Sequence, residues 1–188
     1  MIKINNNSID PVLYQTILKR TQQMYFPANT MVVHAGDTCK YLFLIEKGML
    51  RNFYYDQKGN DITHWFANED TLVTIPPSFF KQKASPFGME AIEDTSVRAI
   101  SFYELEKSFQ EFPILERLAR LFVTDVMIKL GEKIIDLQTK TAEYRYDQLL
   151  AIHPNIFQRA KLGHIAGYLG IKQQSLSRIR ALKNSRKA

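Results

Sequence analysis

The sequence contains a single cysteine, Cys39, and no long run of apolar residues. One cysteine cannot form an internal disulfide, and by itself it cannot hold an iron–sulfur cluster. No apolar run approaches the roughly 18 residues that a membrane-spanning helix needs. The first residues also lack the basic and then apolar layout of a signal peptide. We therefore expect a cytoplasmic protein that does not bind a membrane.

Residue sets for catalysis or metal binding are equally scarce. His34 and His64 are the only histidines in the first 150 residues, and neither belongs to a His-x-His pair. A metal site of the cupin type needs at least three convergent ligands. Cys39 has only Lys40 as a basic neighbour, which favours a structural thiol over a redox-sensitive one. The sequence thus predicts no metal, no cofactor and no enzymatic activity, and a cupin-type enzyme ranks third among the alternatives.

Acidic residues are nearly absent from the end of the chain. The net charge is +6 at pH 7, and residues 139–188 contain ten Lys and Arg residues against only Glu143 and Asp147, so residues 1–138 are net negative. A solvated tail accounts for Lys183 to Lys187, but it does not account for basic residues spread over the whole segment. Residues 139–188 are therefore the part predicted to bind a polyanion.

The sequence has only 8 glycines, and three of them separate the predicted strands of a β-rich region between Met24 and about Ile100. The clearest predicted strands lie in MVVHAGD, YLFLIEKGMLRNFYY, DITHWF and SVRAISF. Gly36, Gly48 and Gly59 lie in turns spaced about a dozen residues apart, which is typical of an antiparallel barrel or a jelly-roll-like β-roll. A short helix over residues 8–23 is predicted to precede this roll.

A long helix is predicted from about residue 113 to about residue 139, with apolar residues on two sides. A helix of this kind must bury both stripes. One stripe can cover the β-roll, and the other can meet a second copy of the helix as a coiled coil. A monomer that encloses the helix fully is the alternative. The residues that we assign to the interface of a homodimer are Leu115, Ala119, Phe122, Val126, Leu130 and Leu137.

The segment LGHIAGYLGIKQQSLSRIR, residues 162–180, has the pattern of a helix-turn-helix. Gly170 occupies the turn, where a positive φ costs glycine little. Six apolar residues fall where two crossing helices need contacts: Ile165, Ala166, Leu169, Ile171, Leu176 and Ile179. The exposed side of the second helix has no acid, and its side chains are of the types that contact base edges and phosphates. These predicted DNA-binding residues are Lys172, Gln173, Gln174, Ser175, Ser177, Arg178 and Arg180. A helical hairpin at the surface of a bundle is the alternative interpretation.

The two motifs KYLFLIEKGMLRNFYYDQKGNDITHWF and LGHIAGYLGIKQQSLSRIR give the chain a resemblance to the Crp/Fnr superfamily of bacterial transcription regulators, over nearly its whole length. The segment TAEYRYDQLL is similar to a linker helix of divergent, Bacteroidetes-type members. The resemblance implies that Gln174, Ser177 and Arg178 match a Glu-x-x-Ser-Arg pattern in the recognition helix. Arg178 would contact a guanine or a phosphate. Gln174 departs from the usual acid, so the target sequence is not transferable from relatives.

The resemblance also raises the question of cyclic AMP. Family members that bind it share a Gly-Glu pair followed by Arg-Ser/Thr-Ala, in which the arginine pairs with the cyclic phosphate. The corresponding region here is TLVTIPPSFFKQKASPFGMEAIEDT, and no arginine lies between Arg51 and Arg98. Lys81 and Lys83 are expected to be solvated. Binding of cyclic AMP in the family's usual mode is therefore not expected.

We predict an α+β protein with an N-terminal antiparallel β-roll sensor domain (1–112), a dimerisation helix (113–138) and an all-α helix-turn-helix domain (139–188). Its predicted partners are double-stranded DNA, a second copy of the chain, RNA polymerase and an effector of unknown identity. The predicted function is sequence-specific regulation of transcription. The alternative is a β-roll module for a small ligand whose helical C-terminus makes protein contacts.

Overall fold

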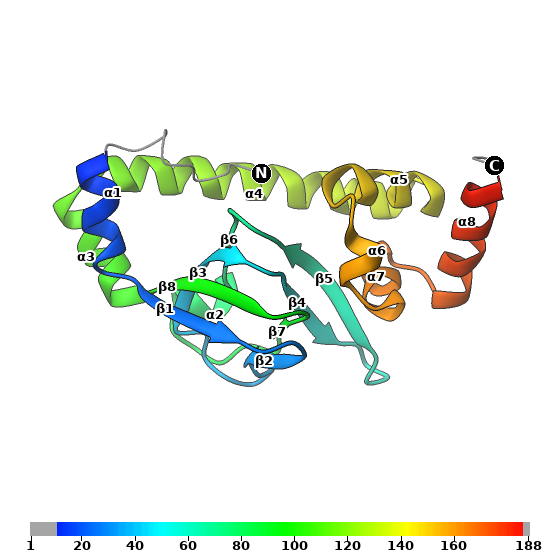
Figure 1. The fold of residues 1–188 in the computed structure, drawn as a ribbon, viewed down its shortest axis with the longest axis horizontal. Coiled ribbons are helices and arrows are strands. Elements are labelled where there is room, and N and C mark those ends of the chain that lie inside the picture. Colours follow the sequence, from blue (N-terminus) through cyan, green and yellow to red (C-terminus); the bar gives the residue numbers. More distant parts are fainter. Residues whose placement is uncertain (1–10, 186–188) are drawn as a thin grey trace.

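The computed structural model describes residues 11–185, which form a β-roll followed by a series of helices (Figure 1). This order of elements confirms the predicted α+β class. The helices are α1 (Pro11–Leu18), α2 (Pro76–Lys81), α3 (Phe102–Glu111), α4 (Pro113–Thr139), α5 (Ala142–Ile152), α6 (Ile156–Arg159), α7 (Leu162–Leu169) and α8 (Gln173–Ser185).

Two four-stranded antiparallel sheets face each other in the roll, with strand orders β1-β8-β3-β6 and β2-β7-β4-β5. Because strands that are distant in sequence are neighbours in each sheet, the roll depends on long-range pairing. The strands are β1 (Gln22–Phe26), β2 (Thr30–Val33), β3 (Tyr41–Lys47), β4 (Leu50–Tyr55), β5 (Asp61–Ala67), β6 (Leu72–Val73), β7 (Gly88–Ala91) and β8 (Thr95–Ser101).

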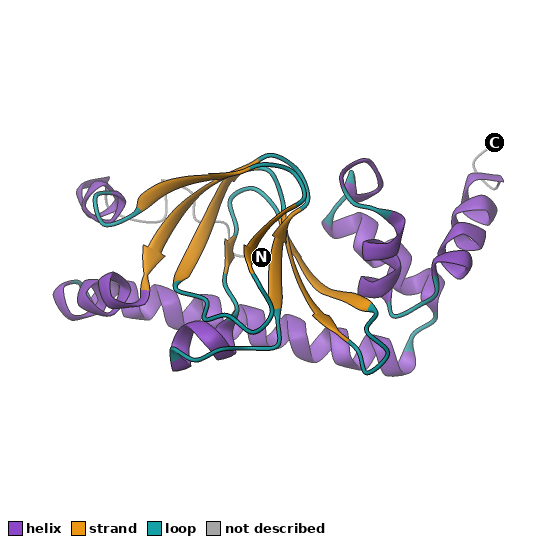
Figure 2. Ribbon diagram, turned by 90° about the horizontal axis from the view of Figure 1, so that it is seen from below, coloured by secondary structure: helices purple, strands orange, loops and turns teal. Residues whose placement is uncertain are grey.

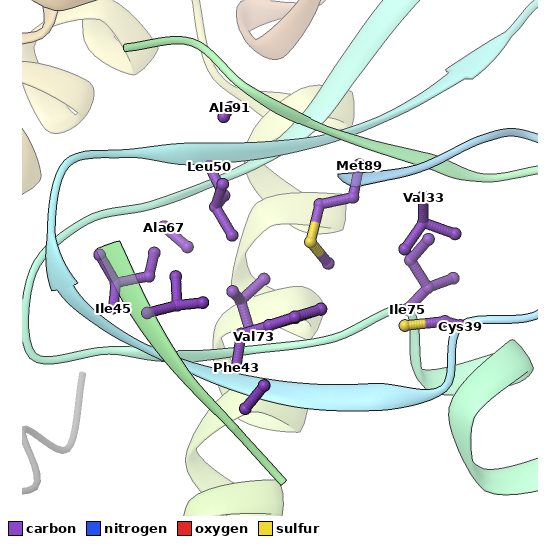
Figure 3. Close-up of a cluster of buried hydrophobic side chains, with 12 residues drawn as sticks. Val33, Cys39, Phe43, Ile45, Leu50, Ala67, Val73, Ile75, Met89 and Ala91 are labelled. Atoms are coloured by element: carbon purple, nitrogen blue, oxygen red, sulfur yellow. The ribbon is translucent and has the colours of Figure 1, made fainter. Parts of the chain in front are cut away.

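Apolar side chains from both sheets meet inside the roll and form its core (Figure 3). Phe43 and Ile45 come from β3 in one sheet, while Leu50 and Met89 come from β4 and β7 in the other, and all four are at most 2% exposed. Alternate residues of a strand point to opposite faces, which is why these strands show the predicted alternation. Cys39 lies in this core with no exposed surface, in agreement with a structural thiol.

The N-terminal helix is shorter than predicted. Residues 22–26 belong to β1, which pairs with β8 from Gln22 opposite Ala99 to Phe26 opposite Thr95. Met24 and Phe26 pack against the core of the roll from this strand. The pairing with β8 therefore outweighs the local helical pattern, because the strand gains both a hydrogen-bonded neighbour and burial. Residues 8–10 of the predicted helix lie outside the described residues.

The long helix α4 runs along one side of the roll, and the helices α5 to α8 gather beyond the roll near its C-terminal end (Figures 1 and 2). These helices enclose a second core that also contains three residues of the roll, Met49, Phe66 and Ile92. The two cores therefore meet at the edge of the roll. This contact determines how α7 and α8 are held relative to β5.

Candidate functional site

Helices α7 and α8 form the predicted helix-turn-helix. Gly170 ends α7 with φ +67° and ψ +35°, a left-handed conformation that glycine adopts without a steric penalty. The chain then turns back, and the amide of Ile171 donates to the carbonyl of Ala166 at 3.0 Å. Five of the six predicted contact residues are buried and Ile171 packs against them, so the predicted apolar contacts are confirmed.

The outer side of α8 presents polar side chains to solvent. Arg178 is exposed, as are five other predicted DNA-binding residues, Lys172, Gln173, Gln174, Ser175 and Ser177. Arg180 differs because its guanidinium lies 4.5 Å from the ring centre of Phe157 and its side chain is half-buried. No Asp or Glu occurs in α8. The surface therefore offers hydrogen-bond donors and positive charge without an opposing carboxylate.

Several basic residues of the C-terminal segment hold the fold together instead of facing solvent. Arg145 donates to the carbonyl of Leu169 at 3.0 Å and to that of Lys140 at 2.6 Å, at the ends of α7 and α4. Lys183 pairs with Asp147 at 2.6 Å. The positive charge available to a polyanion is thus concentrated on α8 and its flanks and is smaller than the residue count suggests. Arg186 and Lys187 lie outside the described residues.

Helix α7 packs directly on the roll at Gly167. A Cβ at this position would lie 3.1 Å from the amide nitrogen of Thr63 and 3.5 Å from Cα of Ile62. A larger residue would therefore push α7 away from β5. Behind this contact, Arg51 is only 2% exposed and donates to Glu90, Asp61 and Thr63. Two carboxylates satisfy this buried arginine, as a buried charge requires.

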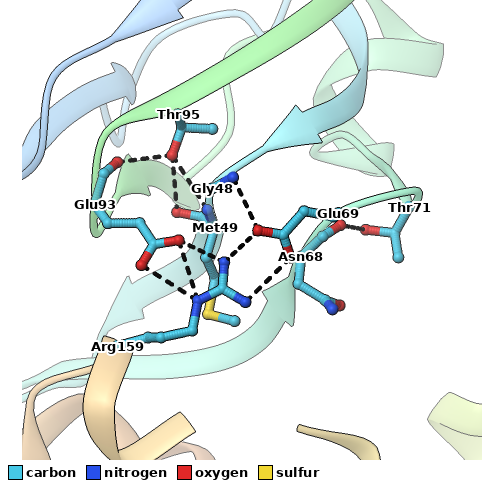
Figure 4. A network of polar contacts seen from close by, with 8 residues as sticks. All are labelled: Gly48, Met49, Asn68, Glu69, Thr71, Glu93, Thr95 and Arg159. Carbon is cyan, nitrogen blue, oxygen red and sulfur yellow. Dashed lines mark hydrogen bonds and ion pairs between the residues drawn. The ribbon is translucent and has the colours of Figure 1, made fainter. Parts of the chain in front are cut away.

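Arg159 joins the helical part to the roll (Figure 4). Its guanidinium donates to Glu69 at 2.7 Å and also to Glu93, which come from two different loops of the roll. Glu69 in turn accepts from the amide of Gly48 at 3.0 Å. Hydrogen bonds from the guanidinium, chiefly to Glu93 and also to Glu69, raise the pKa of Arg159 above its ordinary value. In the sequence, Arg159 is only one of the ten basic residues of segment 139–188, and no local pattern indicates its contacts with the roll.

Lys133 on α4 connects three elements. Its Nζ donates to the backbone carbonyl of His64 on β5 at 2.6 Å and lies 3.5 Å from the ring centre of Tyr168 on α7. Burial lowers the pKa of Lys133 to about 7. Burial is the main cause that lowers the pKa of His64 to about 4, and the charge of Lys133 adds to it. The His64 imidazole is therefore neutral at pH 7. Lys133 therefore points from α4 toward the roll and α7.

A cavity of about 320 Å³ lies between the roll and α4. Its wall on the β5 side contains both His64 and Trp65, although consecutive strand residues normally face opposite ways. The cause is a β-bulge: Asn52 pairs with Trp65, but the next residue of β4, Phe53, pairs with Thr63, which leaves His64 without an opposite residue. The bulge brings two polar-tipped rings to a cavity whose other walls are mainly apolar.

The residues predicted for dimerisation are divided between two environments. Leu115 is 9% exposed and Ala119 is half-buried, while Phe122 and Val126 line the cavity against the chain's own roll. Leu130 and Leu137 are more exposed, at 40% and 41%, although Leu130 also touches the cavity. Only the latter two thus offer a broad surface to a partner. The reason is geometric, because the side of α4 that carries Phe122 and Val126 faces the roll.

An exposed apolar row lies next to that buried face. It has the 4-3-4-3 spacing of a coiled-coil seam. We call it the α4 seam, and its members are Val123, Met127, Leu130, Ile134 and Leu137. Their exposed fractions range from 40% to 65%. A second exposed row at seven-residue spacing contains Ile114, Leu121, Ile128 and Ile135.

Nowhere in residues 11–185 do three or more His, Cys, Asp or Glu side chains gather as ligands for a metal ion. The helices in the same range include none with the length and apolarity needed to cross a membrane.

Comparison with known proteins identifies the fold. Residues 23–112 match the family model of the cyclic nucleotide-binding domain. FixK2 from Bradyrhizobium japonicum has a similar structure, with a TM-score of 0.77 at 16% identity over 89% of this chain and 86% of that chain. A Eubacterium rectale protein described as a transcriptional regulator of the Crp/Fnr family gives 0.70 at 17% identity, over 95% and 86%. The chain has the Crp/Fnr fold.

Another protein of similar structure is CLP of Xanthomonas campestris, a c-di-GMP-responsive global regulator. It gives a TM-score of 0.73 at 12% identity over 95% of this chain and 93% of that chain. A search of curated protein sequences gives no match. The likeness to solved structures is therefore one of fold, and the residues of this chain must carry any argument about what it binds.

The cavity of this Crp/Fnr fold does not suit a cyclic phosphate. Among the described residues that line it, the charged side chains are Asp125 and Lys129, which pair with each other at 2.5 Å. Lys81 and Lys83 are exposed and do not line the cavity. Phe87 contributes an apolar ring to its wall. A buried anion would lack an unpaired cation here.

Proposed function

We propose that the protein is a dimeric regulator of transcription that binds double-stranded DNA through α8. The observation that carries this proposal is the acid-free, exposed face of α8 on a two-helix unit held at the end of the molecule. In this proposal Arg178 contacts a base edge or a phosphate, while Gln174 and Ser177 offer both donors and acceptors. The Crp/Fnr fold supports the proposal, since structures named as transcription regulators share it.

The dimer interface in this proposal is the α4 seam, which refines the set predicted from sequence. Leu130 and Leu137 are common to both sets, whereas Val123, Met127 and Ile134 replace residues that face the roll. Five apolar side chains at heptad spacing, exposed in one chain, would be buried by a second copy of the same helix. A two-fold dimer would then place two copies of α8 about 34 Å apart, one turn of DNA.

A selection experiment tests this function. A library of random duplexes is enriched on the purified full-length protein, and binding of the enriched duplex is measured by fluorescence anisotropy at two salt concentrations. We expect an enriched sequence with two-fold symmetry, and an affinity that falls steeply as salt rises, because phosphate contacts release counterions. No enrichment and no binding at low salt would contradict the proposal. That outcome would favour the alternative in which the helical C-terminus contacts a protein.

A further inference from the structure

We propose that the cavity between the roll and α4 binds an uncharged, mainly apolar aromatic molecule and rejects anions, cyclic nucleotides included. This inference deepens the proposed function by naming the chemical class of its effector. Binding itself does not depend on DNA, so the two proposals can fail separately.

The lining of the cavity suits an aromatic ring system. Aromatic side chains from three segments line it: Trp65 on β5, Phe87 just before β7 and Phe122 on α4. Leu72 and Val126 add aliphatic surface. A cavity of about 320 Å³ lies at the lower end of the range for small-molecule sites, which bind mainly through apolar contacts.

Apart from the Asp125–Lys129 ion pair, the polar side chains that line the cavity are neutral. The His64 ring contacts the rings of Tyr54 and Phe87 at centroid distances of 6.1 and 5.2 Å, and those two rings contact each other at 5.8 Å. Among the described residues, His64 forms a hydrogen bond through its backbone carbonyl and none through its ring nitrogens. Asn52 is 3% exposed and donates through Nδ2 to the carbonyl of Thr74 at 2.8 Å. Its Oδ1 has no partner among the described residues. A neutral imidazole can accept or donate one hydrogen bond to a ligand.

The electrostatics exclude an anion. Lys129 is the only cationic side chain among the described residues that line the cavity, and Asp125 already neutralises it. An anionic ligand would lose its hydration and would also approach the Asp125 carboxylate. An uncharged ligand pays neither cost. The same reasoning applies to a ligand that carries one cyclic phosphate and to a ligand that carries two phosphates.

The ligand would also touch the helix that bears the proposed dimer seam. Val126 and Leu130 line the cavity, and Leu130 is a member of the α4 seam. One turn further along, Lys133 binds the His64 carbonyl and covers the ring of Tyr168 on α7. A ligand in the cavity would therefore contact α4 within one turn of the residue that contacts the helix-turn-helix.

Two dyes of the same skeleton test the proposal on the full-length protein without DNA. N-phenyl-1-naphthylamine is uncharged, and 1-anilinonaphthalene-8-sulfonate adds one sulfonate. We expect the uncharged dye to bind saturably at one per chain, and the sulfonate to bind about tenfold more weakly or worse. Cyclic AMP at millimolar concentration should not displace the uncharged dye. Equal or tighter binding of the sulfonate, or displacement by cyclic AMP, would overturn the ligand class.

Matched variants locate the binding site. Val126→Trp fills the cavity and should weaken binding of the uncharged dye about tenfold or more, whereas Ile128→Trp, at an exposed site of the same helix outside the α4 seam, should leave it within about twofold. If Val126→Trp does not fold, as judged by circular dichroism, Leu72→Trp fills the cavity from β6 instead. Unchanged dye affinity in a folded cavity-filling variant would overturn the site. DNA binding, measured separately on the wild type, reports on the proposed function alone.

Discussion

Arg178 is exposed on α8 and has no ion-pair partner among the described residues. We predict that Arg178→Ala reduces affinity for the selected duplex by about 1–3 kcal/mol per half-site, because a bidentate contact to a base is lost. Lys107→Ala, which removes an exposed charge from α3, is the control and should leave the affinity unchanged. Anisotropy titrations against selected and scrambled duplexes give both values. Wild-type affinity of Arg178→Ala for the selected duplex would show that α8 is not the recognition helix.

His153 illustrates how a buried group makes stability depend on pH. It is 6% exposed, its Nδ1 has no partner among the described residues, and burial, followed by the charge of Arg159, lowers its pKa to about 4. Between pH 6.5 and 4 the unfolded chain binds more protons than the folded one. The free energy of unfolding therefore falls as the pH drops through this window, by up to about 3 kcal/mol for this residue.

Urea titrations at several pH values between 7 and 4.5 test this prediction. His153→Gln should flatten the dependence, although His64, whose pKa is also lowered to about 4, leaves part of it in place. His34→Gln, at an exposed site, should follow the wild type. An unchanged pH dependence in His153→Gln would mean that His153 is not held neutral in the folded protein.

At the scale of elements, α4 offers a sharp test of the dimer interface. Ile134 and Ile135 are neighbours with nearly equal exposure, 56% and 57%, but only Ile134 belongs to the α4 seam. Ile134→Glu should yield monomers at micromolar concentration, because a carboxylate would be buried without a partner in the coiled coil. Ile135→Glu should remain a dimer. Sedimentation velocity distinguishes the two results, and a reversed outcome would assign the interface to the second exposed row.

At the scale of the whole molecule, Arg159 holds the helical part against the roll. We expect Arg159→Gln to lower the free energy of unfolding by about 1–2 kcal/mol, a modest value because the ion pairs are partly exposed to solvent. Lys161→Gln, which alters an exposed charge two residues away, should have almost no effect. Urea titrations measure the difference, and it should shrink at high salt because of screening. An effect as small as that of Lys161→Gln would mean that the bridges to Glu69 and Glu93 contribute little.

The sequence by itself determined the elements whose pattern is local. The helix from 113 to 139 and the helix-turn-helix could be predicted because apolar residues recur with the helical period. The turn at Gly170 could be predicted because its backbone conformation favours glycine. The turns at Gly36, Gly48 and Gly59 were predicted for the same reason, and all three have positive φ. The exposure of Arg178 follows from its place opposite the buried Leu176 and Ile179.

Only the tertiary structure decided which side of α4 faces the roll, because two apolar rows on one helix are equivalent until a neighbour covers one of them. Likewise, Arg159 meets Glu69 across 90 residues and Lys133 meets the carbonyl of His64 across 69. No local periodicity encodes such pairs. The bulge that brings His64 and Trp65 to one cavity arises from the register of β4 and β5, which is a property of two strands together. Local pattern specifies elements, whereas the contacts between them determine what each surface can bind.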